Sequence, residues 1–170
     1  MRNSRRHAIG TLLGAPAALM PWLPATSARA AAPPVPGSKL ALADLPLMEG
    51  GTFRAAEAEG KVVVVYWWAS WCPFCAEMTP SIEELWRTQR ERGMAVIGIS
   101  IDRSVEAAKE SRRRRGYTFP STIHGPGIEH VLPKPRTVPV LWVRDRAGKV
   151  VMAETGQLFP EDVAQIARFL

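Results

Sequence analysis

The stretch "KVVVVYWWASWCPFCAEMTP", residues 61–80, joins a long apolar run to both cysteines of the chain, Cys72 and Cys75. Four consecutive valines followed by three aromatic residues predict a central β-strand that is covered on both faces. Pro73 comes directly after the first cysteine, and proline is favoured at the first position of a helix. The stretch therefore predicts a buried strand, a turn that carries Cys72, and a helix that begins at about Pro73.

Beyond the cysteines, apolar residues recur at helical spacing, and the helix is expected to pack through them: Met78, Ile82, Leu85 and Trp86. The residues assigned to its other faces are charged: Glu83, Glu84, Arg87 and Arg90. Pro80 falls inside this helix and is expected to kink it, and Gly93 is expected to end it.

The rest of the chain alternates strand and helix patterns. Apolar runs predict a buried strand, a short extended piece and a two-stranded hairpin: residues 94–101, 118–123 and 138–156. A helix pattern over residues 104–115, capped by Ser104 or Asp102, follows the buried strand. A second helix pattern, residues 159–170, closes the domain. This order predicts an α/β fold with a mixed sheet, helices on both faces and an antiparallel hairpin at one edge.

Two further segments have weaker patterns. Residues 39–47, with a turn at Gly50 and Gly51, predict a short N-terminal hairpin. Residues 125–139, "GPGIEHVLPKPRTVP", predict a loop-rich connector with one helical turn around residues 128–132.

The first 30 residues differ from the rest of the chain. They carry four arginines and no acid, an apolar stretch from Ala8 to Leu23, and the small-x-small sequence Ala28-Arg29-Ala30. This pattern predicts a secretory signal peptide, residues 1–30, because the apolar stretch is interrupted and a membrane span needs roughly 20 apolar residues. A retained membrane anchor is the alternative, and Ser4-Arg5-Arg6 leaves twin-arginine export open beside the general route.

The charge of the chain lies partly in that segment. Residues 31–38, "AAPPVPGS", predict a disordered Pro-rich linker before a single domain over residues 39–170. Without the first 30 residues the formal charge falls from +6 to about +2. Arg112–Arg115 form one basic run, which indicates a solvated helix face or helix end rather than a nucleic-acid surface. We expect a periplasmic or otherwise exported protein, soluble or membrane-tethered, with no nucleic-acid partner.

Two cysteines are too few for the four ligands that zinc and iron–sulfur sites usually need. The two histidines after residue 30, His124 and His130, lie about 50 residues downstream, lack the close spacing of a ligand pair, and are expected to be surface residues. We therefore expect no metal and no cofactor apart from the cysteine pair itself. Binding of Cu(I) by the two thiolates stays open, because soft thiolates select that ion.

The position of the cysteines favours redox chemistry. A structural disulfide across so short a loop gains little chain entropy. The N-terminus of the predicted helix points unpaired N–H groups and a positive dipole end at Cys72, which stabilises a nucleophilic thiolate. Cys75 lies in the first helical turn and faces back toward it. We expect Cys72 to attack and Cys75 to resolve the mixed disulfide.

These residues resemble the thioredoxin fold. The resemblance covers roughly residues 40–170 and is carried by "WCPFC" after an apolar strand, by Pro80 five residues beyond Cys75, and by Val138-Pro139 at the start of the late hairpin. Within that superfamily, residues 61–80 are similar to the exported TlpA/ResA/CcmG group of thiol-disulfide oxidoreductases. The resemblance implies a thioredoxin-like fold, with a central mixed β-sheet flanked by helices and an N-terminal β-hairpin.

The resemblance also implies roles for single residues. Pro139 would be a cis-proline that faces the disulfide, and the backbone of Val138 would pair with substrate as a short added strand. Trp71 would shield the cysteines and line the substrate-binding surface, to which Pro73 and Phe74 also belong.

Two positions depart from the family pattern. Tyr66 stands where plain thioredoxins carry a buried Asp, and Met78 stands where many TlpA-like proteins carry a Glu. Such a carboxylate would help to deprotonate the resolving thiol. Glu77, one place earlier, is a candidate proton acceptor only if the start of the helix is shifted.

The resemblance implies a reductase of protein disulfides, such as those of apocytochrome c or a copper-site protein. A membrane electron donor of the DsbD/CcdA type would reset it, and we expect a monomer. The alternatives are a net oxidant or isomerase, and a Cu(I)-binding chaperone. Pro73 and Phe74 place an aromatic residue and no basic residue beside the cysteines, which fits either redox direction.

Overall fold

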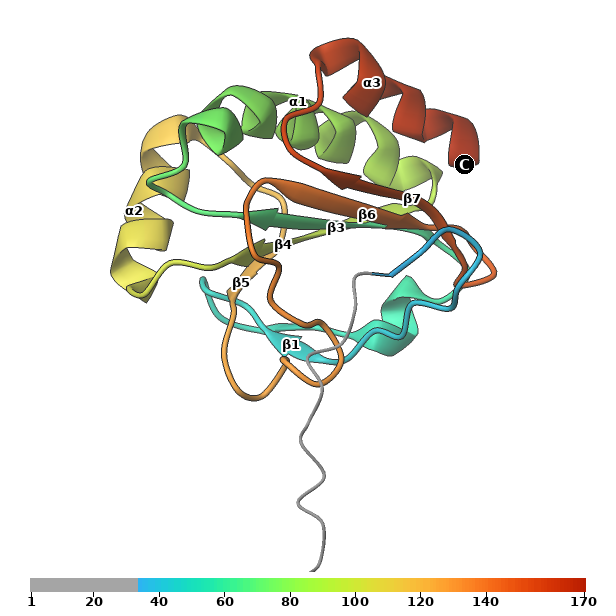
Figure 1. Ribbon diagram of the computed structural model, residues 1–170, viewed down its shortest axis with the longest axis horizontal. Coiled ribbons are helices and arrows are strands. Elements are labelled where there is room, and N and C mark those ends of the chain that lie inside the picture. The colour runs from blue at the N-terminus through green and yellow to red at the C-terminus, as the bar shows by residue number, and fades with distance from the viewer. Residues whose placement is uncertain (1–33) are drawn as a thin grey trace, which may run out of the picture.

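The computed structural model describes residues 34–170, and the elements follow the α/β order that the sequence predicts (Figure 1). The strands are β1 (Leu45–Pro46), β2 (Thr52–Phe53), β3 (Val62–Trp68), β4 (Met94–Ser100), β5 (Ser121–Ile123), β6 (Val140–Arg144) and β7 (Val150–Thr155). The α-helices are α1 (Pro73–Gln89), α2 (Val105–Arg115) and α3 (Pro160–Ala164), and the 3-10 helices are η1 (Ala55–Ala58), η2 (Arg90–Arg92) and η3 (Gln165–Phe169). The predicted signal peptide lies outside the described residues.

Five strands form one mixed sheet in the order β5-β4-β3-β6-β7. β3 pairs in parallel with β4 and antiparallel with β6, so the hairpin β6–β7 forms one edge. All seven residues of β3 are buried, which is the pattern expected of a central strand with both faces covered. The mixed sheet, the edge hairpin and the N-terminal hairpin of β1 and β2 are as predicted.

The two faces of the sheet are covered differently. α1 and α3 pack together over one face, and α2 lies beside α1 (Figure 1). The other face carries the N-terminal hairpin, η1 and the connector that follows β5 (Figure 1). The helical layer expected on that face is therefore reduced to the short η1.

The prediction that Glu83 lies on an outer face of α1 is wrong. Its side chain is buried, and its carboxylate accepts hydrogen bonds from the Thr118 backbone N–H at 2.6 Å, the Thr118 hydroxyl at 2.5 Å and the Phe119 N–H at 3.1 Å. Three donors compensate the desolvation of the carboxylate. Glu83 thus ties α1 to the segment that enters β5.

The basic run also differs from its prediction at one residue. Arg112 is buried: it forms an ion pair with Glu49 at 2.9 Å, donates to the carbonyl of Phe119 at 2.6 Å, and lies over the Phe119 ring. The remaining three arginines, residues 113–115, are exposed at the end of α2 as expected. The run is therefore mostly a solvated helix end, with one arginine used for packing.

Smaller differences concern the ends of elements. The closing helix is α3 followed by η3. The connector consists of turns, and it contains the predicted helical turn, since the Leu132 N–H donates to the Ile128 carbonyl at 2.8 Å. The end of the Pro-rich linker is ordered, because Gly37 N–H donates to Val150 and Val150 N–H donates to Ser38. Across residues 34–170, no helix combines the length and apolar composition needed to cross a bilayer.

Candidate functional site

Cys72 is the N-cap of α1, and the helix begins at Pro73 as predicted. The backbone N–H of Cys75 donates to the Cys72 sulfur at 3.1 Å, so one of the unpaired donors of the first helical turn points at this atom. The two residues form a disulfide, with their Cα atoms 5.2 Å apart, and both are buried. A thiolate formed at Cys72 on reduction would receive this hydrogen bond and the positive end of the helix dipole.

The segment before β6 faces the disulfide. The Val138–Pro139 peptide bond is cis, the geometry that the resemblance implies. The carbonyl oxygen of Val138 lies 3.6 Å from the Cys72 sulfur. The carbonyl of Pro139 accepts from the N–H of Gly156 at 2.9 Å, which ties this segment to the end of β7. Two segments that lie 66 residues apart in sequence therefore meet at Cys72.

Aromatic side chains next to the cysteines are exposed. Trp71 is 65% exposed and Phe74 is 56% exposed, and Pro73 is also at the surface. Most soluble proteins bury rings of this size, so exposed ones close to a reactive group indicate a contact surface. Their predicted role in binding substrate stays a prediction.

Glu77 does not occupy the place that a proton acceptor for Cys75 would need. α1 begins at Pro73, so the register shift on which that role depended is not found. The carboxylate of Glu77 is exposed and accepts a hydrogen bond from the Gln157 side chain at 2.8 Å. Met78, at the position where a family acid was expected, is buried and apolar.

A pair of hydroxyl groups lies behind Cys75. Thr79 donates to the carbonyl of Cys75 at 2.5 Å, and the Tyr66 hydroxyl lies 2.9 Å from the Thr79 oxygen. Because the Thr79 proton is used for the carbonyl, Tyr66 is the donor in the second bond. Burial raises the pKa of Tyr66 far above its usual value, so the phenol stays protonated and remains a donor. The sequence singled out Tyr66 as a departure, but it held no signal for Thr79.

Asp102 fixes the turn that precedes Cys72. Its buried carboxylate accepts from the Ser70 N–H at 3.0 Å, the Ser70 hydroxyl at 2.7 Å and the Ser100 hydroxyl at 2.6 Å. The N-cap of α2 is Ser104, which settles the alternative between Ser104 and Asp102 that the sequence left open. The role of Asp102 in the turn was missed, because Ser70 lies 32 residues away in the chain.

One histidine is not the plain surface residue that was expected. His124 is half-buried, and its ring centroid lies 5.6 Å from that of Trp67. Burial lowers the pKa of His124, and within residues 34–170 its Nε2 atom is buried without a hydrogen-bond partner. His130 is exposed as predicted. In the described part of the chain, no group of three His, Cys, Asp or Glu is arranged to hold a metal ion.

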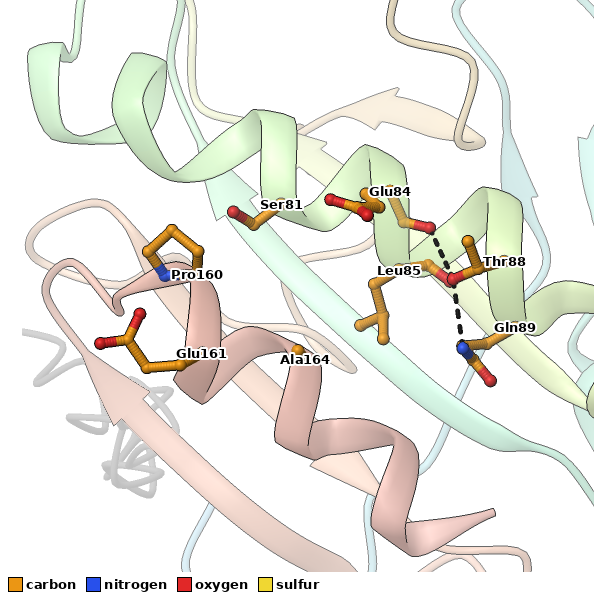
Figure 2. A pocket seen from close by; sticks show the side chains of 8 residues that line it. All are labelled: Ser81, Glu84, Leu85, Thr88, Gln89, Pro160, Glu161 and Ala164. Carbon is orange, nitrogen blue, oxygen red and sulfur yellow. Dashed lines mark hydrogen bonds between the residues drawn. The ribbon is translucent and has the colours of Figure 1, made fainter.

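A surface pocket of about 510 Å³ lies away from the cysteines, between α1 and α3 (Figure 2). Ser81, Glu84 and Thr88 reach it from α1, and Pro160, Glu161 and Ala164 line the opposite wall. Its lining holds neither a cysteine nor a histidine. The chemistry of the two sulfurs is therefore located at the end of the sheet and not in this pocket.

Comparison with known proteins agrees with this geometry. The model of the AhpC/TSA family matches residues 36–125. The thiol-disulfide oxidoreductase ResA of Geobacillus thermodenitrificans is 26% identical over 118 residues, 69% of this chain and 68% of the relative. ResA of Bacillus anthracis is 28% identical over 120 residues, 68% of this chain and 67% of the relative.

Solved structures share the fold. A thiol:disulfide interchange protein of the thioredoxin family from Chlorobium tepidum has a TM-score of 0.69 at 23% identity, covering 81% of this chain and 96% of that one. A secreted disulfide oxidoreductase from Mycobacterium tuberculosis, homologous to E. coli DsbE, has a TM-score of 0.64 at 19% identity. The match covers 77% of this chain and 97% of that one. At these identities the structures establish the thioredoxin-like fold.

Proposed function

The chain belongs to the AhpC/TSA family and is a thiol-disulfide oxidoreductase, and from this premise we propose that it reduces disulfides of target proteins through Cys72 and Cys75. The observation that carries the proposal is the position of the Cys72 sulfur. It accepts the Cys75 N–H at 3.1 Å and lies 3.6 Å from the carbonyl of Val138, beside the cis-proline. A sulfur held in this way is activated and stands next to a backbone segment on which a peptide can pair.

In the proposed reaction the reduced protein donates two electrons. The Cys72 thiolate attacks one sulfur of the target disulfide, and the other sulfur leaves as a thiolate that takes up a proton. A mixed disulfide now joins Cys72 to the target. Cys75 then loses its proton and attacks the Cys72 sulfur, which releases the second target thiolate and forms the disulfide that the structure shows.

The reducing direction rests on the resemblance to the TlpA/ResA/CcmG group, and the residues between the cysteines agree with it without deciding it. Pro73 and Phe74 carry no positive charge that would add to the stabilisation of a Cys72 thiolate, and a dithiol is a strong oxidant when its reduced form is strongly stabilised. We propose a reductase that is reset by a membrane electron donor of the DsbD/CcdA type.

The target is proposed to bind as an extended segment beside Val138, across the exposed rings of Trp71 and Phe74. Suitable targets are exported proteins with accessible disulfides, because a cysteine pair cycles in a compartment where disulfides persist. The predicted signal peptide supports export to that compartment, and cytochrome c maturation or copper-site assembly are processes that need such a reductant.

Three measurements test the proposal. The protein should catalyse the reduction of insulin by a small dithiol, and Cys72→Ser should abolish the catalysis. A reduction potential near or below that of thioredoxin, about −270 mV, supports a reductase, whereas a value near that of DsbA, about −120 mV, would overturn the direction. A Cys75→Ser variant should accumulate mixed disulfides with its targets, which mass spectrometry can identify.

A further inference from the structure

A small cavity touches Cys75 where residues of α1, α2 and the end of β3 come together. Its volume is about 10 Å³, close to the smallest space that holds one water molecule. Its lining includes Cys75 and three hydroxyl-bearing residues of separate segments, Ser70, Thr79 and Ser111. Water in a protein interior needs two to four polar partners, and this lining supplies them.

The rim of the cavity carries a charge. Arg115, at the last position of α2, and Tyr117, just beyond the end of that helix, complete the polar part of the lining. The Arg115 side chain is exposed, so this side connects the interior with solvent. The charged and titratable groups that face Cys75 here are Arg115, Tyr117 and, through Thr79, Tyr66.

The reaction of Cys75 requires a route by which its proton can leave. Its side chain is 1% exposed, and its thiol must lose a proton before the sulfur can attack the mixed disulfide. Glu77 is bonded to Gln157, and the Asp102 carboxylate already accepts from Ser70 and Ser100. The cavity lining contains no carboxylate that would take the proton directly.

We propose that this cavity is the exit for the proton of Cys75, and that Arg115 stabilises the thiolate that remains. The inference rests on the proposed function, because it concerns the second step of the same exchange. A water in the cavity accepts the proton from the Cys75 thiol and passes it to solvent past Arg115. The thiolate then attacks Cys72, and the target sulfur leaves with the electron pair of the broken S–S bond.

The hydroxyl pair behind Cys75 supports this route. Thr79 donates to the Cys75 carbonyl and accepts from Tyr66, which leaves one lone pair of its oxygen for a water in the cavity. Tyr66 and Thr79 are thus positioning residues, and Arg115 acts on the reacting sulfur by its charge.

The second step can be timed by itself with the uncharged probe dithiodipyridine. Reduced protein releases one thiopyridone when Cys72 attacks, at a rate that rises with probe concentration. It releases a second one when Cys75 attacks, at a rate independent of probe concentration. The pH profile of this second phase reports the protonation of Cys75, and an uncharged probe does not itself interact with Arg115.

Arg115→Gln should move the pH profile of the second phase to higher pH. At pH values below the midpoint of that profile, the second phase should be about threefold slower. The effect is modest because an exposed charge acts through solvent. The first phase should not change. Arg114→Gln is the matched control, because Arg114 is an exposed neighbour that lies 3.7 Å from Glu110 and does not line the cavity. Ser111→Val should fill the cavity and slow the second phase without a change of charge.

The outcomes separate two failures. If wild-type protein shows neither phase and Cys72→Ser matches it in insulin reduction, the proposed function itself is wrong. If both phases occur and Arg115→Gln equals Arg114→Gln, Arg115 does not act on Cys75. If Ser111→Val also leaves the second phase unchanged while circular dichroism shows a folded protein, the cavity is not the proton exit.

Discussion

Tyr66 is a buried phenol at a position where plain thioredoxins carry an acid, and here it serves as a hydrogen-bond donor. Its hydroxyl is held by Thr79, which in turn holds the first turn of α1 through the Cys75 carbonyl. A phenol that stays protonated cannot accept the proton of a thiol, but it can fix the group that lies beside the thiol. The two hydroxyls therefore supply orientation and not charge.

Tyr66→Phe removes this donor and keeps the ring. We expect the oxidised protein to lose about 1 kcal/mol of unfolding free energy, the usual net contribution of one hydrogen bond. Denaturant unfolding measures the loss. Tyr117→Phe is the control, because Tyr117 is half-buried and should lose less. Equal losses in the two variants would show that the Tyr66 hydroxyl contributes no more than that of the half-buried Tyr117.

A substitution of Phe74 tests whether the exposed rings beside the cysteines bind substrate. Phe74→Ala should leave the stability within about 0.5 kcal/mol, because the ring is mostly in solvent. It should raise the KM for a protein disulfide about fivefold, the equivalent of one contact of about 1 kcal/mol. The rate with a small disulfide should not change. Val35→Ala removes another exposed apolar side chain from the N-terminal segment and should affect neither quantity.

At the scale of elements, α1 is held in place by polar contacts as well as by its apolar face. Glu83 ties its second half to the segment before β5, and the turn that leads into its first residue is held by Asp102. Because Cys72 lies between that turn and the helix, both contacts bear on its position.

Removing the Glu83 carboxylate leaves the buried Phe119 N–H and the Thr118 N–H without their partner. Glu83→Ala should therefore cost about 2–4 kcal/mol, since hydrogen bonds to a charged group are stronger than neutral ones and buried donors are costly to leave unpaired. Thermal and denaturant unfolding give the value. Glu84→Ala, on the exposed neighbouring position, should cost much less. A cost for Glu83→Ala as small as that of the control would contradict the assigned role.

For the whole molecule, burial of His124 against Trp67 links stability to pH. Burial lowers the pKa of His124 below the ordinary histidine value of 6.5, so the unfolded chain binds this proton more readily than the folded one. The contribution of neutral His124 to the unfolding free energy is complete above pH 6.5. It is lost as the pH falls from there through the pKa of His124 in the folded protein.

The measurement is unfolding free energy as a function of pH in a matched pair of variants. Wild-type protein should lose unfolding free energy as the pH falls below 6.5, and His124→Gln should remove a part of this loss. His130→Gln, at an exposed position, should keep the wild-type profile. A His124→Gln profile that runs parallel to that of wild-type protein would show that His124 is not the group that titrates.

Most of the architecture could be predicted because it depends on local patterns. The run of valines and aromatics in β3, the spacing in α1 and the turn between β6 and β7 each lie within one segment. All of these are properties of neighbouring residues. The meeting of Cys72 with Val138–Pro139, 66 residues away, was expected only from the resemblance to the thioredoxin fold.

The errors concern polar side chains whose partners are distant in sequence. Glu83 and Arg112 were assigned to the surface because charged residues are seldom buried. Their actual partners, near residues 118–119 and at Glu49, are brought close only by the fold. Asp102 and Thr79 were missed for the same reason, since a hydrogen bond across the fold leaves no periodic pattern in the chain.

The point at which the chain enters the domain has a practical consequence. Gly37 and Ser38 form backbone hydrogen bonds with Val150, and Val150 pairs with Arg144. Arg144 in turn pairs with Val63, near the start of β3. Cys72 follows the other end of that strand. A resin or an electrode coupled through the chain ahead of Pro34 therefore attaches at the far end of the sheet. Protein immobilised in this way presents its disulfide to the solution, an orientation suited to recording its potential by voltammetry or to capturing targets from an extract.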